Sequence, residues 1–304
     1  MSTVGFVGLG AMGSRIAGRL LASGHTVYGT DRTAAKGTEL VRGGLRWCGT
    51  PREVAAAADV TFSMVSDDAA VEAVTSGPDG ILAGLAPGKV YVDMSTISPD
   101  ASRRVAERVR AVGADMVDAP VSGSVPAAAD GTLAIMVGGR EDTYHAVEPL
   151  LRVLGRTVTL VGANGQALLL KLAINLNLGA QILAFSEGLL LAERGGLDPK
   201  LAVEVMTGSA IGSPAVQARG PLLLDLPDEA WFDVYLMHKD LRLALDAGHD
   251  LGVPLPAGAT TEAVLTWAAE LGYEHEDIAA LFPVLARTAE SHVTVHNVRS
   301  GDPR

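Results

Sequence analysis

A glycine-rich segment near the start of the chain restricts the possible folds more than any other feature. Gly8, Gly10 and Gly13 follow a strand-like apolar run, residues 4–7, and open a helical pattern, residues 12–22. In this setting the first glycine permits a tight turn, the second lets a pyrophosphate approach the backbone, and the third lets helix and strand pack closely. N–H groups at the helix N-terminus can then bind the phosphates. The segment predicts a dinucleotide site made by Gly8, Leu9, Gly10, Ala11, Met12 and Gly13, the alternative being a turn that binds nothing.

Short β-branched runs alternate with helical patterns through the first half of the chain. The further strands are expected at residues 26–28, 60–64, 90–93, 116–117 and 133–137, and the further helices at 69–74 and 99–112. This alternation predicts βαβ units and a parallel, doubly wound sheet. After Val161 the pattern becomes helical, with helices expected at residues 164–194, 200–207, 235–251, 260–271 and 277–291.

The expected architecture is therefore α/β, with two domains. Residues 1–163 would form a Rossmann-type dinucleotide-binding domain. Residues 164–304 would form an all-helical domain for substrate binding and dimerisation, joined to the first by the long helix 164–194. A chain of 304 residues is long enough for two such domains.

The overall composition excludes several classes of function. The net charge is −11 and no basic run occurs, the densest cluster being Arg103, Arg104, Arg108 and Arg110, so nucleic acid binding is disfavoured. Cys48 is the single cysteine, which excludes internal disulfides and suits a reducing cytosol. No apolar signal segment is evident, and the uncharged stretch 172–186 is short for a membrane span. We expect a cytoplasmic protein with that stretch buried as a helix.

The second expected strand ends in a group of residues that bears on the choice of cofactor. Asp31 lies where an acid would accept hydrogen bonds from an unphosphorylated adenosine ribose. Arg32 is the residue type that pairs with a 2′-phosphate, and Thr33 and Lys36 complete a cationic loop. The two signals conflict unless Asp31 turns outward or caps the loop. We favour NADP, with use of both NAD and NADP left open.

Small polar residues follow two further strands. Ser122, Gly123 and Ser124 could direct several backbone N–H groups at one carboxylate, although an ordinary Ser/Gly turn fits the spacing equally well. Ser95 and Thr96 lie at the carboxyl edge of the sheet, where they could contact nicotinamide or substrate or instead cap the helix after Pro99. Residues at this edge that we assign to the cofactor also include Met64 and Val65.

Lys171 is one of five lysines in the chain and has apolar neighbours on both sides. Because an ammonium is costly to bury unless it is paired or loses its proton, a lysine in this setting usually has a chemical task. Asn175 follows one helical turn later, on the same face. The pair has the character of a proton donor with a polar partner. By contrast, periodicity alone places Lys239 outside the apolar stripe of its helix, as a solvated residue.

Metal binding is not expected. His292 and His296 have the spacing of helical metal ligands, but no carboxylate accompanies them in a recognisable pattern.

Taken together, the ordered motifs resemble those of the β-hydroxyacid dehydrogenases, most closely the 3-hydroxyisobutyrate dehydrogenase and tartronate semialdehyde reductase group. The resemblance covers nearly the whole chain and rests on the glycine-rich segment, residues 93–96, residues 118–123, Lys171 with Asn175, and Lys239 with Asp240. It implies hydride transfer between NAD(P) and a β-hydroxyacid or its semialdehyde. It also implies that Lys171 is the general acid/base.

The resemblance assigns further residues as well. Asn175 would bind substrate, Ser122 and Gly123 its carboxylate, and Lys239 would lie near the cofactor. One departure is Ser124, where the family usually has a second glycine, so the size or identity of the substrate can differ. Two rival functions remain: imine reduction, performed on the same scaffold by relatives that usually lack this lysine, and non-catalytic NADP binding. The apolar long helix and the leucine-rich segment 221–226 indicate a homo-oligomer, at least a dimer.

Overall fold

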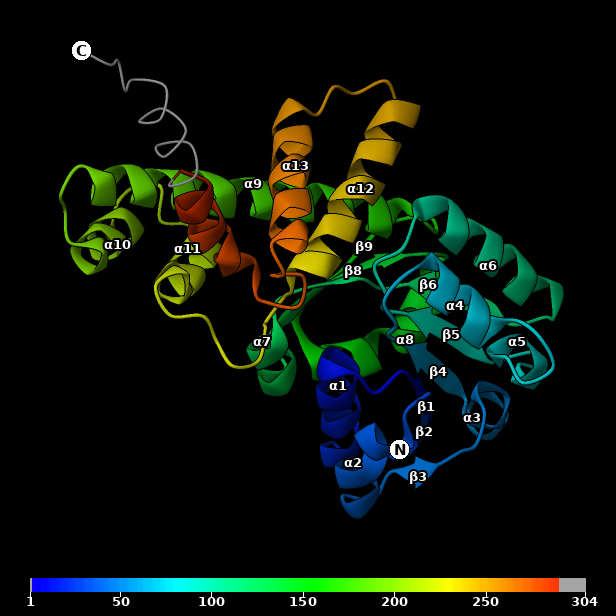
Figure 1. Cartoon of the computed structure of the whole chain (residues 1–304). Helices are drawn as coiled ribbons and strands as arrows, with labels where there is room; N and C mark the ends of the chain where they lie inside the picture. Colours follow the sequence, from blue (N-terminus) through cyan, green and yellow to red (C-terminus); the bar gives the residue numbers. More distant parts are fainter. Residues whose placement is uncertain (1, 290–304) are drawn as a thin grey trace, which may run out of the picture. The chain divides into compact units, whose positions relative to one another are not determined.

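A computed structural model describes residues 2–289 of the chain (Figure 1). They divide into two compact units. The first ends at Ala173 and the second begins at Ile174, so that the division falls within the long helix α9 (Gln166–Arg194).

The first unit is built on a nine-stranded sheet, as far as the described residues go. The strands are β1 (Thr3–Val7), β2 (Thr26–Thr30), β3 (Arg46–Trp47), β4 (Val60–Ser63), β5 (Val90–Asp93), β6 (Asp115–Asp118), β7 (Val121–Ser122), β8 (Leu133–Gly138) and β9 (Gly155–Gly162). Six of them run parallel in the order β3-β2-β1-β4-β5-β6, and β8 adds antiparallel pairs with β6 and β7 and a parallel pair with β9. In such sheets ligands bind at the carboxyl ends of the strands where the order reverses, here between β1 and β4.

Helices cover both faces of this sheet (Figure 1). One face packs on α1 (Ala11–Ala22), α2 (Thr38–Arg42), α7 (Val125–Asp130) and α8 (Glu141–Leu154), and the other on α3 (Pro51–Ala57), α4 (Asp68–Thr75), α5 (Ile81–Gly84) and α6 (Pro99–Ala111). A short 3₁₀ turn, η1 (Ala34–Gly37), precedes α2. Each face has its own apolar core, centred on residues such as Phe6 and Ile16 on one side and Tyr91 and Ile97 on the other. Two cores around one sheet are what parallel strands with crossover helices require.

The doubly wound sheet and its predicted strands are confirmed, but the sequence did not predict all of the elements. It missed β3, β7 and β9 and several helices, of which α8 is the longest. Pro149 lies inside α8, where a proline normally counts against a helix, although the buried residues of α8 keep helical spacing. The predicted helix start at Asn164 is also wrong by two residues. Gly165 has a φ of +89°, which is outside helical geometry, and α9 therefore begins at Gln166.

Two buried carboxylates lie side by side at the carboxyl edge of the sheet. Asp93 ends β5 and Asp118 ends β6; the two residues are register partners and both are fully buried. Asp93 Oδ1 accepts hydrogen bonds from Ser63 Oγ at 2.7 Å and from the Ser95 N–H at 3.1 Å. Asp118 Oδ1 accepts from the Gly165 N–H at 2.9 Å. Buried polar groups thus contribute to holding this edge, in addition to apolar packing.

Burial is the main reason that the Asp118 carboxyl has a raised pKa, about 6 against an ordinary 3.8. The Asp93 carboxylate raises it further, whereas the hydrogen bonds from Gly165 and Asn164 oppose the shift. Asp118 therefore binds its proton more tightly in the folded than in the unfolded chain.

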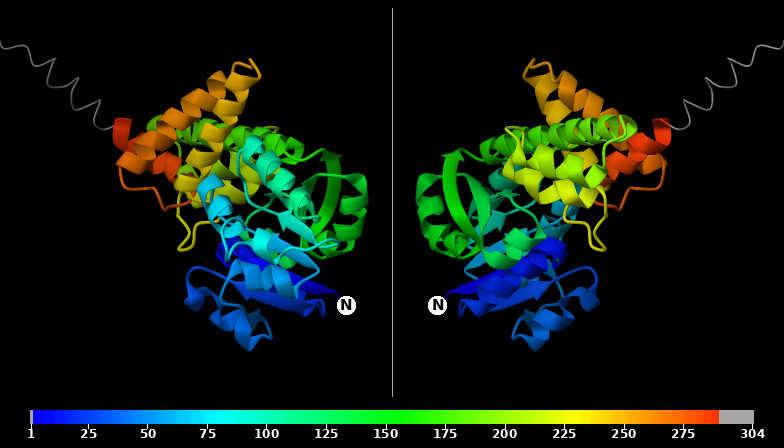
Figure 2. Two further views of the ribbon diagram at one scale, coloured as in Figure 1. Left: turned by 90° about the vertical axis from the view of Figure 1, so that its right-hand side faces the viewer. Right: turned by 90° about the vertical axis from the view of Figure 1, so that its left-hand side faces the viewer.

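The second unit is helical over its described residues. Besides the remainder of α9 it contains α10 (Pro199–Gly208), α11 (Pro214–Arg219), η2 (Gly220–Leu223), α12 (Val234–Asp250), α13 (Pro256–Glu270) and η3 (Ile278–Ala280), with helical turns continuing to Ala289. Helices α12 and α13 lie side by side (Figure 2). One core joins α9 with α12 and α13, and another joins α9 with α10, α11 and η2.

A buried ion pair fixes the turn before α12. Arg219 Nη1 donates to both carboxylate oxygens of Asp277 at 2.7 and 2.8 Å, and the Trp231 and Phe232 N–H groups donate to the same carboxylate. Because the donors come from Arg219 at the end of α11 and from the segment just before α12, Asp277 joins both to the start of η3.

Helix α9 is long and apolar enough to span a membrane by length and composition, with 44% of its most apolar window buried inside the protein. Its apolar residues contribute to protein cores: Leu168 to a core of the first unit, and Ile182 and Leu189 to cores of the second. A central helix of a folded protein passes the same test, and the burial of these residues favours that explanation.

The raised pKa of Asp118 predicts a pH-dependent stability. The stabilisation that protonated Asp118 provides is present below about pH 4 and is lost as pH rises through 6, because the folded state then binds more protons than the unfolded state. The raised pKa corresponds to a change of roughly 3 kcal/mol in the free energy of unfolding across this pH range. Replacing Asp118 by Asn removes this titration. We expect the stability of Asp118→Asn relative to wild type to increase between pH 4.5 and pH 7.5 in urea unfolding. A difference between the two proteins that stays constant with pH would contradict the shift.

Candidate active site

The glycine-rich turn connects β1 to α1 with close backbone packing. Gly8 has a φ of +93°, and a Cβ there would lie 2.4 Å from the Met64 carbonyl oxygen. A Cβ at Gly13 would lie 2.0 Å from the Gly8 carbonyl oxygen. Both positions therefore require glycine for reasons internal to the fold.

Gly10 differs from its two neighbours. A Cβ at this position would meet no atom of the described chain within 4 Å, so packing does not explain the glycine. No side chain caps α1, and the N–H groups of its first turn have no partner within the helix. An open backbone surface next to a helix N-terminus fits the pyrophosphate of a dinucleotide. The residues present therefore fit an NAD(P) cofactor.

Leu9 has a different function from that of the three glycines. Its side chain is buried in the core, and its N–H donates to Asp31 Oδ2 at 2.8 Å. The Leu9 N–H is thus used within the protein. The other oxygen of Asp31 accepts from the Thr33 N–H at 2.8 Å. Asp31 caps the loop, which is one of the two ways in which the conflict with Arg32 could be resolved. Around it, Arg32, Thr33 and Lys36 are all exposed.

Ser95 and Thr96 follow β5 but have different environments. Ser95 is buried, and its Oγ accepts from the Val65 N–H at 3.0 Å, which joins the ends of β4 and β5. Thr96 is partly exposed, as are Met64 and Val65. Neither Ser95 nor Thr96 caps α6; that role belongs to Ser98, whose Oγ accepts from the Ala101 N–H. Of the pair, Thr96 is therefore the residue that a bound ligand can reach.

In the segment Ser122–Ser124, Ser122 ends β7, Gly123 forms a bend and Ser124 immediately precedes α7. Ser122, in β7, pairs with Ala134 of β8 and is partly exposed. Gly123 has a φ of +130°, and a Cβ there would overlap Leu133 Cδ2 at 2.8 Å. Ser124 precedes α7 with an ordinary φ of −102°, and its side chain does not cap that helix. Ser124 therefore replaces the usual glycine of the family without backbone strain, and its hydroxyl has no capping role.

Lys171 lies on the early turns of α9, in the first unit, and is 9% exposed. Its neighbours Leu168 and Leu172 are fully buried. The side chain is thus withdrawn from bulk water, as the sequence led us to expect of a lysine with a chemical task.

Asn175 belongs to a buried polar group in the second unit. Its Nδ2 donates to Asp240 Oδ2 at 2.5 Å, and both residues are almost completely buried. The other carboxylate oxygen of Asp240 lies 2.8 Å from Lys239 Nζ. Only 16% of the Lys239 side chain is exposed, so the solvated position that periodicity alone indicated is wrong.

Two buried acids at these sites lie in motifs that carry the resemblance, but the sequence assigned no role to either of them. Asp240 lies in the buried stripe of α12, between Met237 and Ala244, where an acid at a helical core position was a signal. Asp118 had no such signal, because a strand end gives no indication of what approaches it from 47 residues away.

Within residues 2–289 no group of three or more His, Cys, Asp or Glu side chains could hold a metal ion. His292 and His296 lie outside the described residues.

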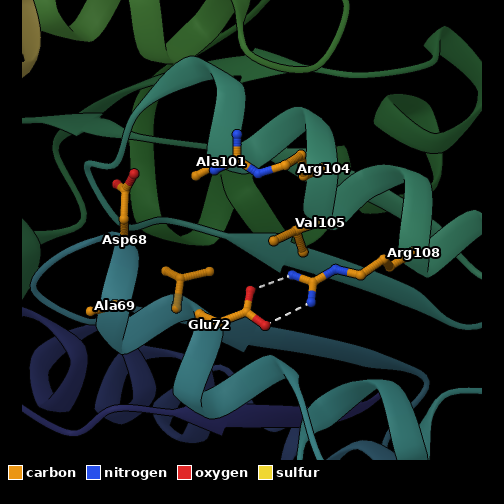
Figure 3. A pocket seen from close by; sticks show the side chains of 8 residues that line it. Asp68, Ala69, Glu72, Ala101, Arg104, Val105 and Arg108 are labelled. Carbon is orange, nitrogen blue, oxygen red and sulfur yellow. Dashed lines mark hydrogen bonds and ion pairs between the residues drawn. The ribbon is translucent and has the colours of Figure 1, made fainter.

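A cavity of about 220 Å³ lies between α4 and α6, and none of its lining residues is a predicted site residue (Figure 3). Arg108 and Glu72 form a two-point ion pair in its wall, with the closest approach at 2.7 Å. The Arg108 hydrogen bonds lower the pKa of Glu72 to about 2. The cavity is therefore bounded by a salt bridge that joins two helices.

Comparison with known proteins identifies the family. Residues 3–162 match the model for the NAD-binding domain of 6-phosphogluconate dehydrogenase. Residues 164–285 match the model described as the NAD-binding domain of NADP-dependent 3-hydroxyisobutyrate dehydrogenase.

Individual relatives agree with these matches. The 2-(hydroxymethyl)glutarate dehydrogenase of Eubacterium barkeri is 38% identical over 92% of this chain and 94% of its own length. The 2-hydroxy-3-oxopropionate reductase of Escherichia coli is 37% identical over 93% and 96%. The structure of Mycobacterium tuberculosis 3-hydroxyisobutyrate dehydrogenase with L-serine has a TM-score of 0.82 at 31% identity, covering 94% of this chain and 99% of that one. An imine reductase of Pseudomonas sp. is more distant, at 26% identity and a TM-score of 0.62. The chain therefore belongs to the β-hydroxyacid dehydrogenases, a family of NAD(P)-dependent oxidoreductases that act on small hydroxyacids.

Proposed function

We propose that this enzyme interconverts a small β-hydroxyacid and its semialdehyde, with Lys171 as the general acid/base. The observation that supports this most is the burial of Lys171 on the first turns of α9, in the same compact unit as the glycine-rich turn. A lysine that is largely withdrawn from bulk water is suited to proton transfer with a bound substrate.

The bound nicotinamide supplies the hydride chemistry. In the oxidation direction the β-hydroxyl proton passes to the neutral Lys171 amine as the carbon releases its hydride and the C=O bond forms. In reduction the Lys171 ammonium returns the proton to the developing alkoxide. Ser122, Gly123 and Ser124 hold the substrate carboxylate, and Asn175 binds substrate with its amide plane fixed by Asp240. Lys239, beside Asp240, is assigned to the cofactor.

Ser124 makes this substrate site different from that of relatives with two glycines. Its hydroxyl is not used to cap α7 and its side chain is partly exposed, so it adds a hydrogen-bonding group beside the carboxylate. Such a group favours a substrate with a second polar substituent near the acid.

The rival functions are less well supported. Imine reduction would not require Lys171, and imine reductases are the more distant structural relatives. A non-catalytic binding protein would not need the buried Lys171, and the named relatives are dehydrogenases and reductases.

Replacing Lys171 by Ala tests the proposed role directly. We expect kcat to fall by roughly 10²–10⁴-fold while cofactor affinity is retained, because proton transfer is lost and phosphate binding is not. The assay is absorbance of the reduced nicotinamide with glyoxylate, succinic semialdehyde, 2-hydroxy-3-oxopropionate, 3-hydroxyisobutyrate and 2-(hydroxymethyl)glutarate, beside a cyclic imine. Lys200→Ala, on α10, is the matched control and should keep wild-type rates. A kcat of Lys171→Ala that is still half that of wild type would exclude the assignment.

NADP is the cofactor we propose to be preferred. Asp31 is occupied by the Leu9 and Thr33 N–H groups, whereas Arg32 and Lys36 are exposed on the same loop. The match of the second half of the chain to an NADP-dependent family model supports the same choice.

Arg32→Ala should raise the KM for NADP by about 10–100-fold, the cost of losing one or two charged hydrogen bonds. The KM for NAD should change little, because NAD has no 2′-phosphate. Arg42→Ala, an exposed arginine on α2, is the control. An equal loss with both cofactors would show that Arg32 does not read the 2′-phosphate.

We further propose that residues 1–163 form the cofactor domain of a cytoplasmic enzyme and that residues 164–304 also mediate association into at least a dimer. The leucines of segment 221–226 are packed against the core of their own unit, so they do not support a subunit contact. A different surface of the second unit supports a subunit contact. The C-terminal part of α9 and its neighbours line an apolar groove of about 470 Å³, in which Leu191 is 77% exposed and Trp267 is 45% exposed.

Light scattering at micromolar concentration should give at least twice the chain mass of 31.3 kDa. A charge at Leu191 would be buried at the subunit contact, so Leu191→Glu should yield monomers. Leu251→Glu carries the same change at an exposed leucine outside the groove and should leave the assembly intact. A monomeric wild-type protein would refute the proposed association.

A further inference from the structure

Asp118 connects two parts of the chain that carry predicted substrate residues. It ends β6, four residues before Ser122. Its Oδ1 also accepts hydrogen bonds from the Gly165 N–H at 2.9 Å and from Asn164 Nδ2 at 3.2 Å. Gly165 immediately precedes α9, the helix that carries Lys171.

The contact with Gly165 determines where α9 begins. The Gly165 carbonyl accepts the first i+4 hydrogen bond of the helix, from the Leu169 N–H at 3.0 Å. Gly165 itself is buried, so its N–H needs a protein acceptor, and Asp118 supplies one. A carboxylate at the first turn of a helix also interacts favourably with the helix dipole. Lys171 follows six residues later, about 9 Å along the axis.

Asn164 extends the same connection to neighbouring elements. Its Nδ2 also lies 3.1 Å from the carbonyl oxygens of Met116 in β6 and Gly138 in β8. Its Oδ1 accepts from Arg110 of α6 at 3.2 Å. The start of α9 is therefore tied to two strands and a helix of the first unit.

We propose that Asp118 is a positioning residue for the reaction: it fixes the start of α9 to the carboxyl end of β6 and so sets the position of the Lys171 amine relative to the Ser122–Gly123 segment. This inference rests on the proposed function, since it requires Lys171 to be the proton donor. Asp118 does not contact substrate in this role; it acts through the helix.

The chemistry of Asp118 favours a functional explanation over a purely structural one. Its Oδ2 is buried and has no hydrogen-bond partner among the described residues, and burial raises its pKa to about 6. An ionised carboxylate here lowers stability near neutral pH. Its gain over a neutral side chain is a charge-assisted hydrogen bond to the Gly165 N–H, which holds the helix more firmly.

A graded series at this position tests the proposal. Asp118→Asn keeps an acceptor oxygen, and we expect kcat to fall by about 2–5-fold. Asp118→Ala and Asp118→Val remove the acceptor, and we expect kcat to fall by about 10–100-fold, since a displacement of about 1 Å of a catalytic group costs this much. The KM for the hydroxyacid and the Kd for NADP, measured by nucleotide fluorescence, should change by less than about 3-fold. The substrate is the compound of the panel above that the wild type turns over fastest.

Ser102→Ala is the matched control. Ser102 Oγ donates to the same oxygen of Asp118 at 3.3 Å, is equally buried, and lies on α6 without contact to the start of α9 in the hydrogen bonds described. Ser102→Ala removes one hydrogen bond to Asp118 but leaves the start of α9 attached to it. If the position of α9 determines the rate, kcat should therefore stay within about 2-fold of wild type.

A double-mutant cycle separates this proposal from the role of Lys171. In the Lys171→Ala background, Asp118→Ala should cause no further loss of kcat, because the group that it positions is gone. An undiminished loss in that background would overturn the inference and leave Lys171 as the acid/base. Normal turnover by Lys171→Ala alone would instead refute the proposed function. If neither Asp118→Ala nor Asp118→Val folds, Asp118 is a stability residue and the inference is wrong.

Discussion

At Gly8 and Gly13 the first strand, the first helix and the strand beside them approach so closely that one methyl group at either glycine would overlap a carbonyl oxygen. This packing leaves Gly10 as the position whose open face is not filled by protein. The rest of the site depends on that arrangement, because the strand order reverses between β1 and β4 and the ends of the neighbouring strands then face the same edge.

The carboxyl edge is stabilised by polar groups rather than by apolar contacts alone. Asp31 closes the cofactor loop, Asp93 joins β5 to Ser63 and Ser95, and Asp118 holds the start of α9. Each of these acids accepts hydrogen bonds from backbone N–H groups, which orient loops precisely but lack the adaptability of apolar packing. In the second unit Asp240 accepts instead from a side chain, the Nδ2 amide of Asn175. Four carboxylates outside the glycine-rich motif thus hold segments that carry predicted site residues, and three of them, Asp93, Asp118 and Asp240, are buried.

The sequence predicted most of what depends on local pattern. The strand ending at Asp93 and the helix starting at Pro99 were found because β-branched runs and proline at a first helical turn are local signals. Helix α8 was not predicted because Pro149 within it is a helix-breaking signal, and β9 because it follows that helix directly.

The site residues also divide into those that local sequence reveals and those that depend on contacts between distant segments. The glycines, Lys171 and Asn175 were evident from composition and spacing. That Leu9 gives its N–H to Asp31, that Ser95 is buried against Val65, and that Asp118 reaches Gly165 depend on contacts between distant segments, which no local pattern encodes.

The central claim is that Lys171 exchanges a proton with the substrate hydroxyl. A crystal structure of the enzyme with NADP and a hydroxyacid substrate tests it most directly. The account predicts Lys171 Nζ within about 3.2 Å of the β-hydroxyl oxygen, with the carboxylate of the acid on Ser122 and Gly123. A complex in which another side chain contacts that oxygen, with Lys171 turned away from the bound acid, would contradict it.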